Sequence, residues 1–438
     1  MKIFLSYLTT VIILTQYSNA QTFDVTLATK LQTTIDSMKI ANNIKGISAS
    51  VIYPGQGMWK GVTGDSYSGL SITSDMEFGI ASNTKLFTGV IALKLAQSGL
   101  ISLDDSLHNW LPTFANVDSN ITIRQLLNHT SGLADVNSVI GYSDSILLNP
   151  YKIYTPSQVI TWVGTPLFPA GTSWSYSNTN YLLAAMIAET STGQSYGKIL
   201  HDSILTPLQL DSTFLDVYDS IIGTISHPWQ VGVDKNSTPR KALNSAAWSA
   251  GGMYSTSSEM AQWYWALMNG QVLNLNSFNE LTTFVGSGNY SIGLYETSIL
   301  GRIIWQHGGT IWGGYNSSMM YDTTTHAVIC VLTNQNPAQA FLVAKQMLQN
   351  IISFNPVGVN EISPTQKNLA IVPNPTSGNV HVKIVGEKLQ SIKVYNLTGE
   401  LLLEHFTNDF SIANLPNGIY FINTQTTEST FINKLIKQ

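Results

Sequence analysis

Ser82 and Lys85 lie three positions apart at the start of a strongly apolar run, within the stretch ASNTKLFTG at 81–89. The apolar residues that follow cover most of a helix circumference, which predicts a buried helix that stops near Gly99. On such a helix the two side chains share one face and come within hydrogen-bonding reach. A serine hydroxyl becomes nucleophilic when a base takes its proton, and burial lowers the pKa of a lysine enough to make it that base. The pair therefore predicts acyl-transfer chemistry.

The Ser-x-x-Lys pattern alone has a simpler interpretation, in which the serine caps a helix and the lysine is solvated. A second copy of the pattern occurs at Ser195 and Lys198, in the stretch QSYGK. There we predict only the polar start of another helix. Other residues must decide between the two interpretations of the first copy.

A second group of polar residues lies in the stretch FPAGTSWSYSNTNYLL, where a Pro-, Gly- and Ser-rich loop leads into an apolar helix beginning near Thr179. Tyr176 could shuttle protons if a nearby ammonium lowered its pKa from about 10. Asn178 carries an amide that could bind a substrate carbonyl. It could also serve as the helix N-cap, and the two roles are compatible.

A third group, WQHGGTIWGG, follows the predicted strand RIIW. His307, Gly308 and Gly309 predict a strand edge that a substrate backbone could approach closely, because glycine has no side chain. The backbone N–H near Thr310 could pair with that of Ser82 to form an oxyanion hole. The alternative is a histidine beside a glycine turn, with no catalytic role.

Periodicity and turn signals predict the elements that must position these groups. The stretch at 46–64 predicts a β-hairpin, and strands return at 302–309 and 317–334 before a final helix at 337–354, whose predicted apolar face includes Phe341. Helices lie between, three of them with predicted capping boxes, at Thr122, Thr155 and Thr256. Strands from both ends of this region predict one largely antiparallel sheet.

The chain divides into segments of different texture. Residues 21–354 form the predicted α/β domain, 355–365 a linker, and 366–438 a small all-β domain of short alternating strands. Residues 1–20 combine a basic start, an apolar stretch and small residues, which is the layout of a secretory signal peptide. The alternative is a membrane anchor, but the apolar stretch falls short of the ~20 residues that a span needs. No span is predicted in the mature chain.

Charge and cysteine content exclude several kinds of partner and site. The net charge is -5 and no dense block of Lys or Arg occurs, so neither nucleic acid nor an anionic membrane is a predicted partner. Cys330 is the only cysteine and lies in the apolar run AVICVL. It cannot form an internal disulfide, and we expect neither a thiol nucleophile nor a metal site.

Together the three groups resemble one known family. Ser82 and Lys85, Tyr176 and Asn178, then the His307-Gly-Gly segment follow the order and approximate separations of motifs in class C β-lactamases and D-alanyl-D-alanine carboxypeptidases. The stretches ITIRQLLNHTSGL, PLQLDST, AGGMYSTSSEMAQW and YSIGLY extend the resemblance. It implies a β-lactamase/transpeptidase-like α/β sandwich, in which an antiparallel sheet with flanking helices meets a helical lobe and the site lies in the cleft between them.

The resemblance also implies roles for the residues. Ser82 would attack a carbonyl and become acylated, while Lys85 and Tyr176 would relay its proton to the leaving group. Tyr176 would then help water to release the acyl group. Asn178 and the segment His307 to Thr310 would bind the substrate, with the N–H groups of Ser82 and Thr310 on the oxyanion. No metal and no organic cofactor is implied.

One departure from the family bears on the substrate. Where the class C enzymes carry Lys-Thr-Gly, this chain has His307, Gly308 and Gly309, and so lacks a cation and a hydroxyl that contact a substrate carboxylate. A histidine with its ordinary pKa near 6.5 is mostly neutral outside the cell. We therefore expect a peptidase or esterase acting on a less acidic substrate rather than a strong β-lactamase. His129, in LNHTSGL, falls at a position that the family uses structurally.

The module at 366–438 resembles the sorting domain of type IX secretion, through VPNPTSGNVHV, VYNLTGELL, LPNGIYFI and FINKLIKQ. The resemblance implies export to the cell surface or medium by that secretion machinery, and a carbohydrate-binding β-sandwich is the alternative. The leading hypothesis is an exported serine hydrolase that cleaves an amide, ester or lactam bond in a small-molecule or peptide substrate. The alternatives are an esterase or D-aminopeptidase on the same scaffold, a penicillin-binding receptor acylated without turnover, and an adhesin with a vestigial hydrolase domain.

Overall fold

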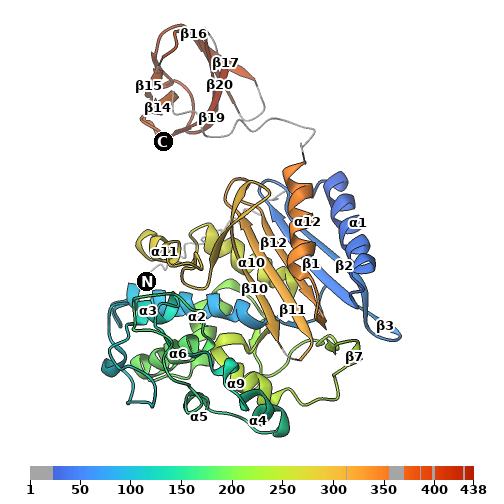
Figure 1. The fold of residues 1–438 in the computed structure, drawn as a ribbon. Helices are drawn as coiled ribbons and strands as arrows, with labels where there is room; N and C mark the ends of the chain where they lie inside the picture. Colours follow the sequence, from blue (N-terminus) through green and yellow to red (C-terminus); the bar gives the residue numbers. More distant parts are fainter. Residues whose placement is uncertain (1–22, 312, 355–368, 385, 397–399, 428–429) are drawn as a thin grey trace, which may run out of the picture. The chain divides into compact units, whose positions relative to one another are not determined.

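The chain forms two units in the computed structural model, one within residues 1–354 and the other within 355–438 (Figure 1). The structure describes residues 23–311, 313–354, 369–384, 386–396, 400–427 and 430–438. The predicted signal peptide at 1–20 and the predicted linker at 355–365 lie outside these residues. In the described part, no helix is both long enough and apolar enough to cross a membrane.

A seven-stranded antiparallel sheet forms the centre of the first unit, with the order β3-β2-β1-β12-β11-β10-β9. Its strands are β1 (Gly46–Tyr53), β2 (Gly57–Tyr67), β3 (Leu70–Ser71), β9 (Tyr295–Ile299), β10 (Arg302–Ile311), β11 (Tyr315–Asp322) and β12 (Val328–Thr333). Strand β1, from the start of the chain, pairs with β12 near the end of the unit, in the register Ile47 to Thr333. The predicted hairpin and the single sheet built from both ends are therefore confirmed.

Helices cover both faces of this sheet because the side chains of each strand alternate between them. On β1, Ile47, Ala49 and Val51 pack against α1 (Val25–Ala41) and α12 (Ala340–Ile352), which lie side by side in Figure 1. Ser48 and Ser50 face α10 (Ser257–Met268), where both hydroxyls hydrogen-bond the Ser257 side chain. The predicted final helix is present, but Phe341 is 38% exposed, so its place on the apolar face was wrong. The helix buries Val343, one turn before Met347, instead.

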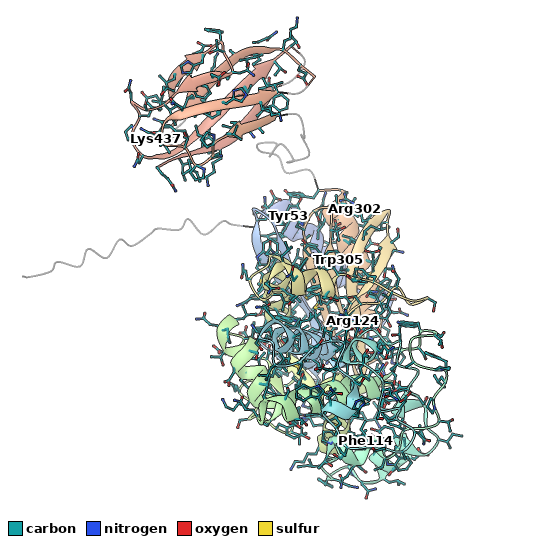
Figure 2. All side chains as sticks on the ribbon, turned by 90° about the vertical axis from the view of Figure 1, so that its left-hand side faces the viewer. Tyr53, Phe114, Arg124, Arg302, Trp305 and Lys437 are labelled. Atoms are coloured by element: carbon teal, nitrogen blue, oxygen red, sulfur yellow. The ribbon has the colours of Figure 1, made fainter. Side chains whose placement is uncertain are left out.

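A helical lobe is inserted between β3 and β9, and it packs around α2 (Thr84–Gln97) and α6 (Asn178–Thr192). The remaining described helices of the lobe are α3 (Ile123–Leu127), α4 (Tyr142–Leu148), α5 (Pro156–Ile160), α7 (Tyr196–Leu200), α8 (Thr206–Leu208), α9 (Lys241–Gly251) and α11 (Leu275–Leu281). Arg124 on α3, labelled in Figure 2, pairs with Asp104 at 2.8 Å and with Glu280 on α11, and so ties together remote parts of the lobe.

Capping explains where several of these helices start. Thr122 and Thr155 form the predicted reciprocal capping boxes at the starts of α3 and α5. Thr256 caps the Glu259 N–H at the start of α10. The Glu259 carboxylate accepts hydrogen bonds from Ser212 and Thr213 rather than from the backbone N–H of Thr256. The third predicted capping box is therefore only half formed, because a tertiary partner competes for the glutamate.

The second unit contains only strands among its described residues, which confirms the predicted small all-β domain. One sheet has the order β14-β15-β18 and the other β17-β16-β19-β20. The strands are β14 (Leu369–Val372), β15 (Asn379–Ile384), β16 (Leu389–Tyr395), β17 (Leu401–His405), β18 (Asp409–Ser411), β19 (Gly418–Thr426) and β20 (Thr430–Lys437). A separate core that includes Val382 of the first sheet and Ile392 and Ile422 of the second holds the unit together.

Candidate active site

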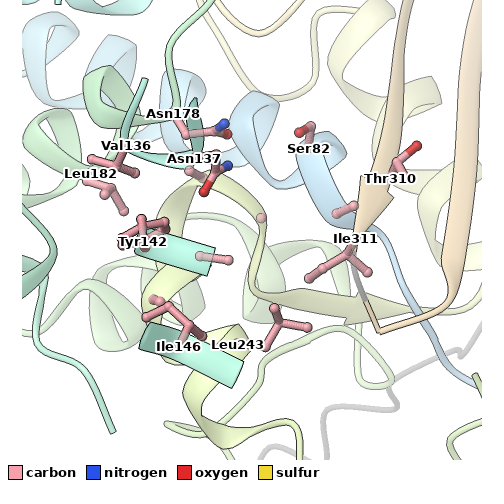
Figure 3. Close-up of a pocket in the computed structure, with 15 residues that line it drawn as sticks. Ser82, Val136, Asn137, Tyr142, Ile146, Asn178, Leu182, Leu243, Thr310 and Ile311 are labelled. Atoms are coloured by element: carbon pink, nitrogen blue, oxygen red, sulfur yellow. The ribbon is translucent and has the colours of Figure 1, made fainter. Parts of the chain in front are cut away.

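Ser82 lies on a tight turn that precedes helix α2. Residues Ala81–Asn83 form a 3-10 turn, and Ala81 has a φ of 49°, a left-handed conformation that a non-glycine residue rarely adopts. Such local strain is typical of functional sites. The turn leaves Ser82 half-buried, and Figure 3 shows it near Thr310 among the residues that line a pocket. The sequence prediction that Ser82 lies at the N-terminal end of a buried helix is confirmed.

Lys85 is fully buried on the first turn of α2. Its Nζ lies 3.2 Å from Ser82 Oγ, 2.6 Å from Asn178 Oδ1 and 2.7 Å from the Ala250 carbonyl oxygen. Burial lowers the pKa of Lys85 to about 7, and the carboxylate of Asp135 opposes part of that decrease. A large fraction of the side chain is therefore uncharged near neutral pH.

The contacts of Lys85 Nζ suit a neutral amine that acts as a base. Two of its neighbours, Asn178 Oδ1 and the Ala250 carbonyl, can only accept hydrogen bonds. A neutral amine has two N–H groups for these acceptors and one lone pair left over. The remaining neighbour is Ser82 Oγ, whose O–H can donate to that lone pair. A deprotonated Lys85 can therefore accept a proton from the Ser82 hydroxyl.

A break in helix α9 supplies the carbonyl that holds Lys85. Trp248 has a φ of 37° and a ψ of -122°, which interrupts the regular helix. The carbonyls just beyond the break turn toward α2, where Ser249 O accepts from Thr88 Oγ1 at 2.7 Å and Ala250 O accepts from Lys85. Backbone acceptors placed in this way fix the amine without adding a charge.

Asn178 is held between Lys85 and Asp135. Its Oδ1 accepts from Lys85, and its Nδ2 donates to the Asp135 carboxylate at 3.0 Å. The orientation of the amide is fixed by chemistry, because an amine needs the oxygen and a carboxylate needs the N–H groups. The N-cap of α6 is Ser177, so the interpretation of Asn178 as an N-cap was wrong. Asn178 lines the pocket of Figure 3, and its binding of substrate stays a prediction.

Tyr176 lies with its ring close to Lys85, at 4.9 Å from Nζ to the ring centroid. Burial raises the pKa of Tyr176 well above its ordinary value, and the neighbouring Ser82 side chain opposes that increase. No hydrogen bond of good geometry to the Tyr176 hydroxyl is found among the described residues. The phenol is therefore protonated in the resting site, so it can donate a proton but cannot serve as the initial base. The sequence interpretation made proton shuttling conditional on a pKa lowered by a nearby ammonium, and burial shifts the pKa of Tyr176 in the opposite direction.

His307 is buried and neutral. Its Nδ1 donates to the Gly308 carbonyl at 2.6 Å, so its Nε2 accepts from the Tyr290 hydroxyl at 3.2 Å. Burial lowers the pKa of His307 to about 3, and the nearby Lys85 contributes in the same direction. His307 therefore offers no cation to a substrate carboxylate at neutral pH.

The second cavity at Ser82 lies on the Tyr176 side. It is lined by Ser82, Tyr176, Tyr295, Gln306, His307, Gly308 and Thr310, none of which is a lysine, arginine, aspartate or glutamate. The pairing of β10 with β9 ends at Gln306, so the edge of β10 beyond that residue is free on this side. A substrate carbonyl could approach that edge, as the sequence predicted for His307 to Thr310.

Gly309 lies against the turn that carries Ser82. A Cβ atom at Gly309 would lie 2.4 Å from the Ile80 carbonyl oxygen and 2.9 Å from Ala81 Cβ, whereas one at Gly308 would meet its nearest atom, Ser317 O, at 3.5 Å. Only Gly309 therefore needs to be glycine for packing reasons.

We predict that Gly309→Ala lowers kcat/KM about 10²-fold, because it displaces Ser82 from β10, and overpacking costs about 1–3 kcal/mol of stability. Gly164→Ala is the control, because a Cβ atom there would come no closer than 3.7 Å to Ala134 Cβ and the residue lies outside the site, and it should change both quantities little. Kinetics on an activated ester and chemical denaturation of both variants measure these effects. Equal losses in the two variants would contradict this explanation.

The Asp135 carboxylate, which Asn178 joins to Lys85, partly opposes the effect of burial on the pKa of Lys85. Since its carboxylate favours the ammonium form, Asp135→Asn should lower the pKa of Lys85 further. The acid limb of the kcat/KM pH profile should then move to lower pH. Asp144→Asn, an exposed acid on α4, is the control and should leave the limb in place. A limb that stays fixed in Asp135→Asn, or moves to higher pH, would exclude Lys85 as the titrating base.

Three neighbours of the site were missed from the sequence. In the sequence Asp135 resembles an ordinary helix-capping residue, and its side chain does accept from the Asn137 N–H at the start of a short 3-10 helix. Ala250 acts through a backbone carbonyl, which no side-chain pattern can reveal. Tyr290 is one of several buried tyrosines, and only its contact with His307 distinguishes it.

Three other polar residues named from the sequence, His129, Ser195 and Lys198, make contacts that support the fold. His129 is buried, accepts from Asn180 Nδ2 at 2.9 Å, and packs its ring 4.4 Å from that of Tyr176. Ser195 caps α7, and Lys198 pairs with Asp202 at the surface, so the second Ser-x-x-Lys is the helix start that we predicted. No group of three or more His, Cys, Asp or Glu side chains able to hold a metal occurs among the described residues.

Comparison with solved structures supports the fold described above. A D-stereospecific amidohydrolase from Streptomyces sp. is 28% identical, with a TM-score of 0.65, and the alignment covers 72% of this chain and 97% of that one. The D-amino acid amidase from Ochrobactrum anthropi SV3, in complex with L-phenylalanine amide, shares the fold at 24% identity, with a TM-score of 0.66 over 75% of this chain and 99% of that one.

Sequence comparison gives partial relatives and two family matches. Protein flp of Staphylococcus aureus (strain COL) is 37% identical over 143 residues, which is 31% of this chain and 28% of flp. Penicillin-binding protein 4* of Bacillus subtilis (strain 168) is 33% identical over 142 residues, 31% of this chain and 30% of that protein. The matched segment thus spans less than a third of each curated relative. Residues 370–438 match the secretion system C-terminal sorting domain, and residues 31–350 match the Beta-lactamase family. Because that match covers most of the chain and the fold agrees with it, the chain belongs to the β-lactamase family of serine hydrolases.

Proposed function

We propose that this protein is an exported serine hydrolase that forms an acyl-enzyme on Ser82 and cleaves an amide or ester bond. The observation that carries the proposal is the buried Lys85 amine, 3.2 Å from Ser82 Oγ and held by two acceptors. Export follows from the match of residues 370–438 to a secretion sorting domain, and we propose type IX secretion to the cell surface or medium.

The proposed reaction has two steps. In the first, the Ser82 proton passes to the neutral amine of Lys85 while Oγ attacks the substrate carbonyl. The C–N or C–O bond then breaks, and the proton passes from Lys85 through Tyr176 to the leaving amine or alkoxide. In the second step, water adds to the Ser82 ester, its proton returns to Ser82 Oγ, and the carboxylic acid leaves. Each turnover consumes one water and restores the starting protonation.

The oxyanion is proposed to bind the backbone N–H groups of Ser82 and Thr310. Both residues line the two cavities that meet at the nucleophile. Donors fixed by the backbone are already oriented before charge develops, and loss of one such donor typically costs about 10²–10³ in kcat.

The surroundings of His307 favour a substrate without a carboxylate next to the scissile bond. The histidine is neutral, and the cavity on the Tyr176 side has no charged lysine or arginine in its wall. A β-lactam or a peptide ending in D-alanine presents a carboxylate there. The 28% identical amidohydrolase is named as D-stereospecific, and we therefore propose amides of D-amino acids as the first class to test.

A substrate panel tests the proposal. The full chain should release product from D-amino acid amides and nitrophenyl esters, with nitrocefin and peptides carrying a free D-alanine carboxylate turned over at least tenfold more slowly. A fluorophosphonate probe should label the wild type and not Ser82→Ala. Labelling that persists without product release would support the receptor hypothesis, and faster turnover of the carboxylate-bearing substrates would overturn the proposed selectivity.

A further inference from the structure

A large cavity adjoins the pocket of Ser82 and has no part in the reaction described above. It holds about 440 Å³ of space, which lies within the range of roughly 300–1,000 Å³ usual for small-molecule sites. Ile146, Leu243 and Ile311 line both this cavity and the pocket in Figure 3. In that view Ile146 and Leu243 lie at the end of the pocket away from Ser82. These three apolar side chains therefore form the boundary between the two spaces.

The position of Tyr176 shows which part of a substrate faces this boundary. Ser82 and Thr310 line the cavity that contains Tyr176 and also the pocket that contains Asn178 and Leu243. Under the proposed function, on which this inference rests, Tyr176 protonates the leaving group. The leaving group then occupies the Tyr176 side, so the acyl group must extend from Ser82 toward Leu243.

The walls of the adjoining cavity are mainly apolar near α4. Ile146, Leu147 and Pro150 lie on or just after that helix, and Ile225 and Pro228 come from the chain segment before α9. Leu147 is 54% exposed although it lines the cavity, so part of this wall stays in contact with water. Covering it with an apolar group would gain about 25 cal/mol for each Å² removed from water.

The charged residues of this cavity do not make it an anion site. Arg240 donates through Nε to the buried carboxylate of Asp216 at 2.7 Å, so its charge is matched by a neighbour. Lys235 is half-buried and lies beside Asn236 and Thr238, which are exposed. Lys235, Asn236 and Thr238 therefore mark a part of the cavity that meets solvent, whereas the apolar side chains shared by the two spaces adjoin the pocket of Ser82.

We propose that this cavity receives the distal part of an apolar acyl chain, and that the natural substrate is an amide or ester of an elongated apolar acid. The chain would leave the ester carbon at Ser82, pass Leu243 and lie along Leu147. Short acyl groups would be turned over from the pocket of Ser82 alone, without use of the adjoining cavity.

A series of p-nitrophenyl esters from acetate to octanoate tests this proposal on the full chain. Since the leaving group is constant, kcat/KM should rise about two- to fourfold for each added methylene that enters the cavity. The octanoate to acetate ratio of kcat/KM should therefore exceed tenfold in the wild type. Leu147→Asp should lower that ratio at least tenfold, because it places a carboxylate in the apolar wall.

Leu148→Asp is the matched control, since this neighbouring leucine is 79% exposed and lines neither cavity. It should leave the ratio unchanged. Leu243→Trp, which fills the boundary, provides a second test and should also lower the ratio. Ester turnover without a preference for long chains, or equal effects of Leu147→Asp and Leu148→Asp, would overturn the proposal while the proposed function stands. No turnover of any ester, together with no labelling of Ser82, would overturn the proposed function and this inference with it.

Discussion

Replacing Ser82 with alanine is expected to lower kcat/KM on the order of 10⁶-fold, the loss typical when a nucleophilic serine is removed from such a unit. The side chain is half-buried and adjoins the pocket, so the change should leave the fold intact. The variant should also fail to form a covalent adduct with a fluorophosphonate, as read by intact mass. Thermal unfolding should show that the variant remains folded.

Ser195→Ala is the control for this prediction, because it removes the serine of the other Ser-x-x-Lys. That serine caps α7, so its loss should cost about 0.5–2 kcal/mol of stability and leave kcat/KM within twofold. If Ser82→Ala kept more than a tenth of the wild-type activity, Ser82 would not be the nucleophile.

Replacing Lys85 with methionine is expected to lower kcat/KM about 10²–10⁴-fold, the usual contribution of a positioned general base. Methionine approximates the length and volume of the lysine stem without its amine, so packing in α2 should be retained. The change leaves Asn178 Oδ1 and the Ala250 carbonyl without their donor, at about 1–3 kcal/mol for each unsatisfied group. Removal of an amine that is costly to bury offsets part of this loss.

Lys198→Met is the matched control, since Lys198 has the same sequence spacing but makes a surface ion pair with Asp202. Such exposed pairs contribute about 0–1 kcal/mol. Its kcat/KM should stay within twofold of the wild type in the same assay. Comparable activity in the two lysine variants would remove Lys85 from the mechanism.

Sequence periodicity was sufficient to predict the main architecture. The alternation in β1 and the strands near the end of the first unit specified one antiparallel sheet, and the turn-rich texture after Phe354 specified the second, all-β unit. These patterns are local, and each reports which face of an element is buried. The error at Phe341 has the same origin, because helical spacing predicts a face but not where that face ends.

The candidate site was only partly accessible from the sequence. The sequence pattern indicated Ser82, Lys85 and Tyr176 because their side chains can act in acyl transfer. It indicated the glycines of β10 because the absence of a side chain leaves room for a substrate. Asp135 and the Ala250 carbonyl act on Lys85 only through the tertiary fold. Burial raises the pKa of Tyr176, and the depth of that burial cannot be seen in the sequence.

The central claim is that a neutral Lys85 amine takes the proton of Ser82, and the pH dependence of Ser82 labelling tests it most directly. The second-order rate constant for fluorophosphonate labelling should rise with pH through a midpoint of about 7, because only the unprotonated amine can act as base. The same rise should be absent in Lys85→Met. A midpoint near the ordinary lysine value of about 10.4, or an unchanged profile in Lys85→Met, would contradict the account.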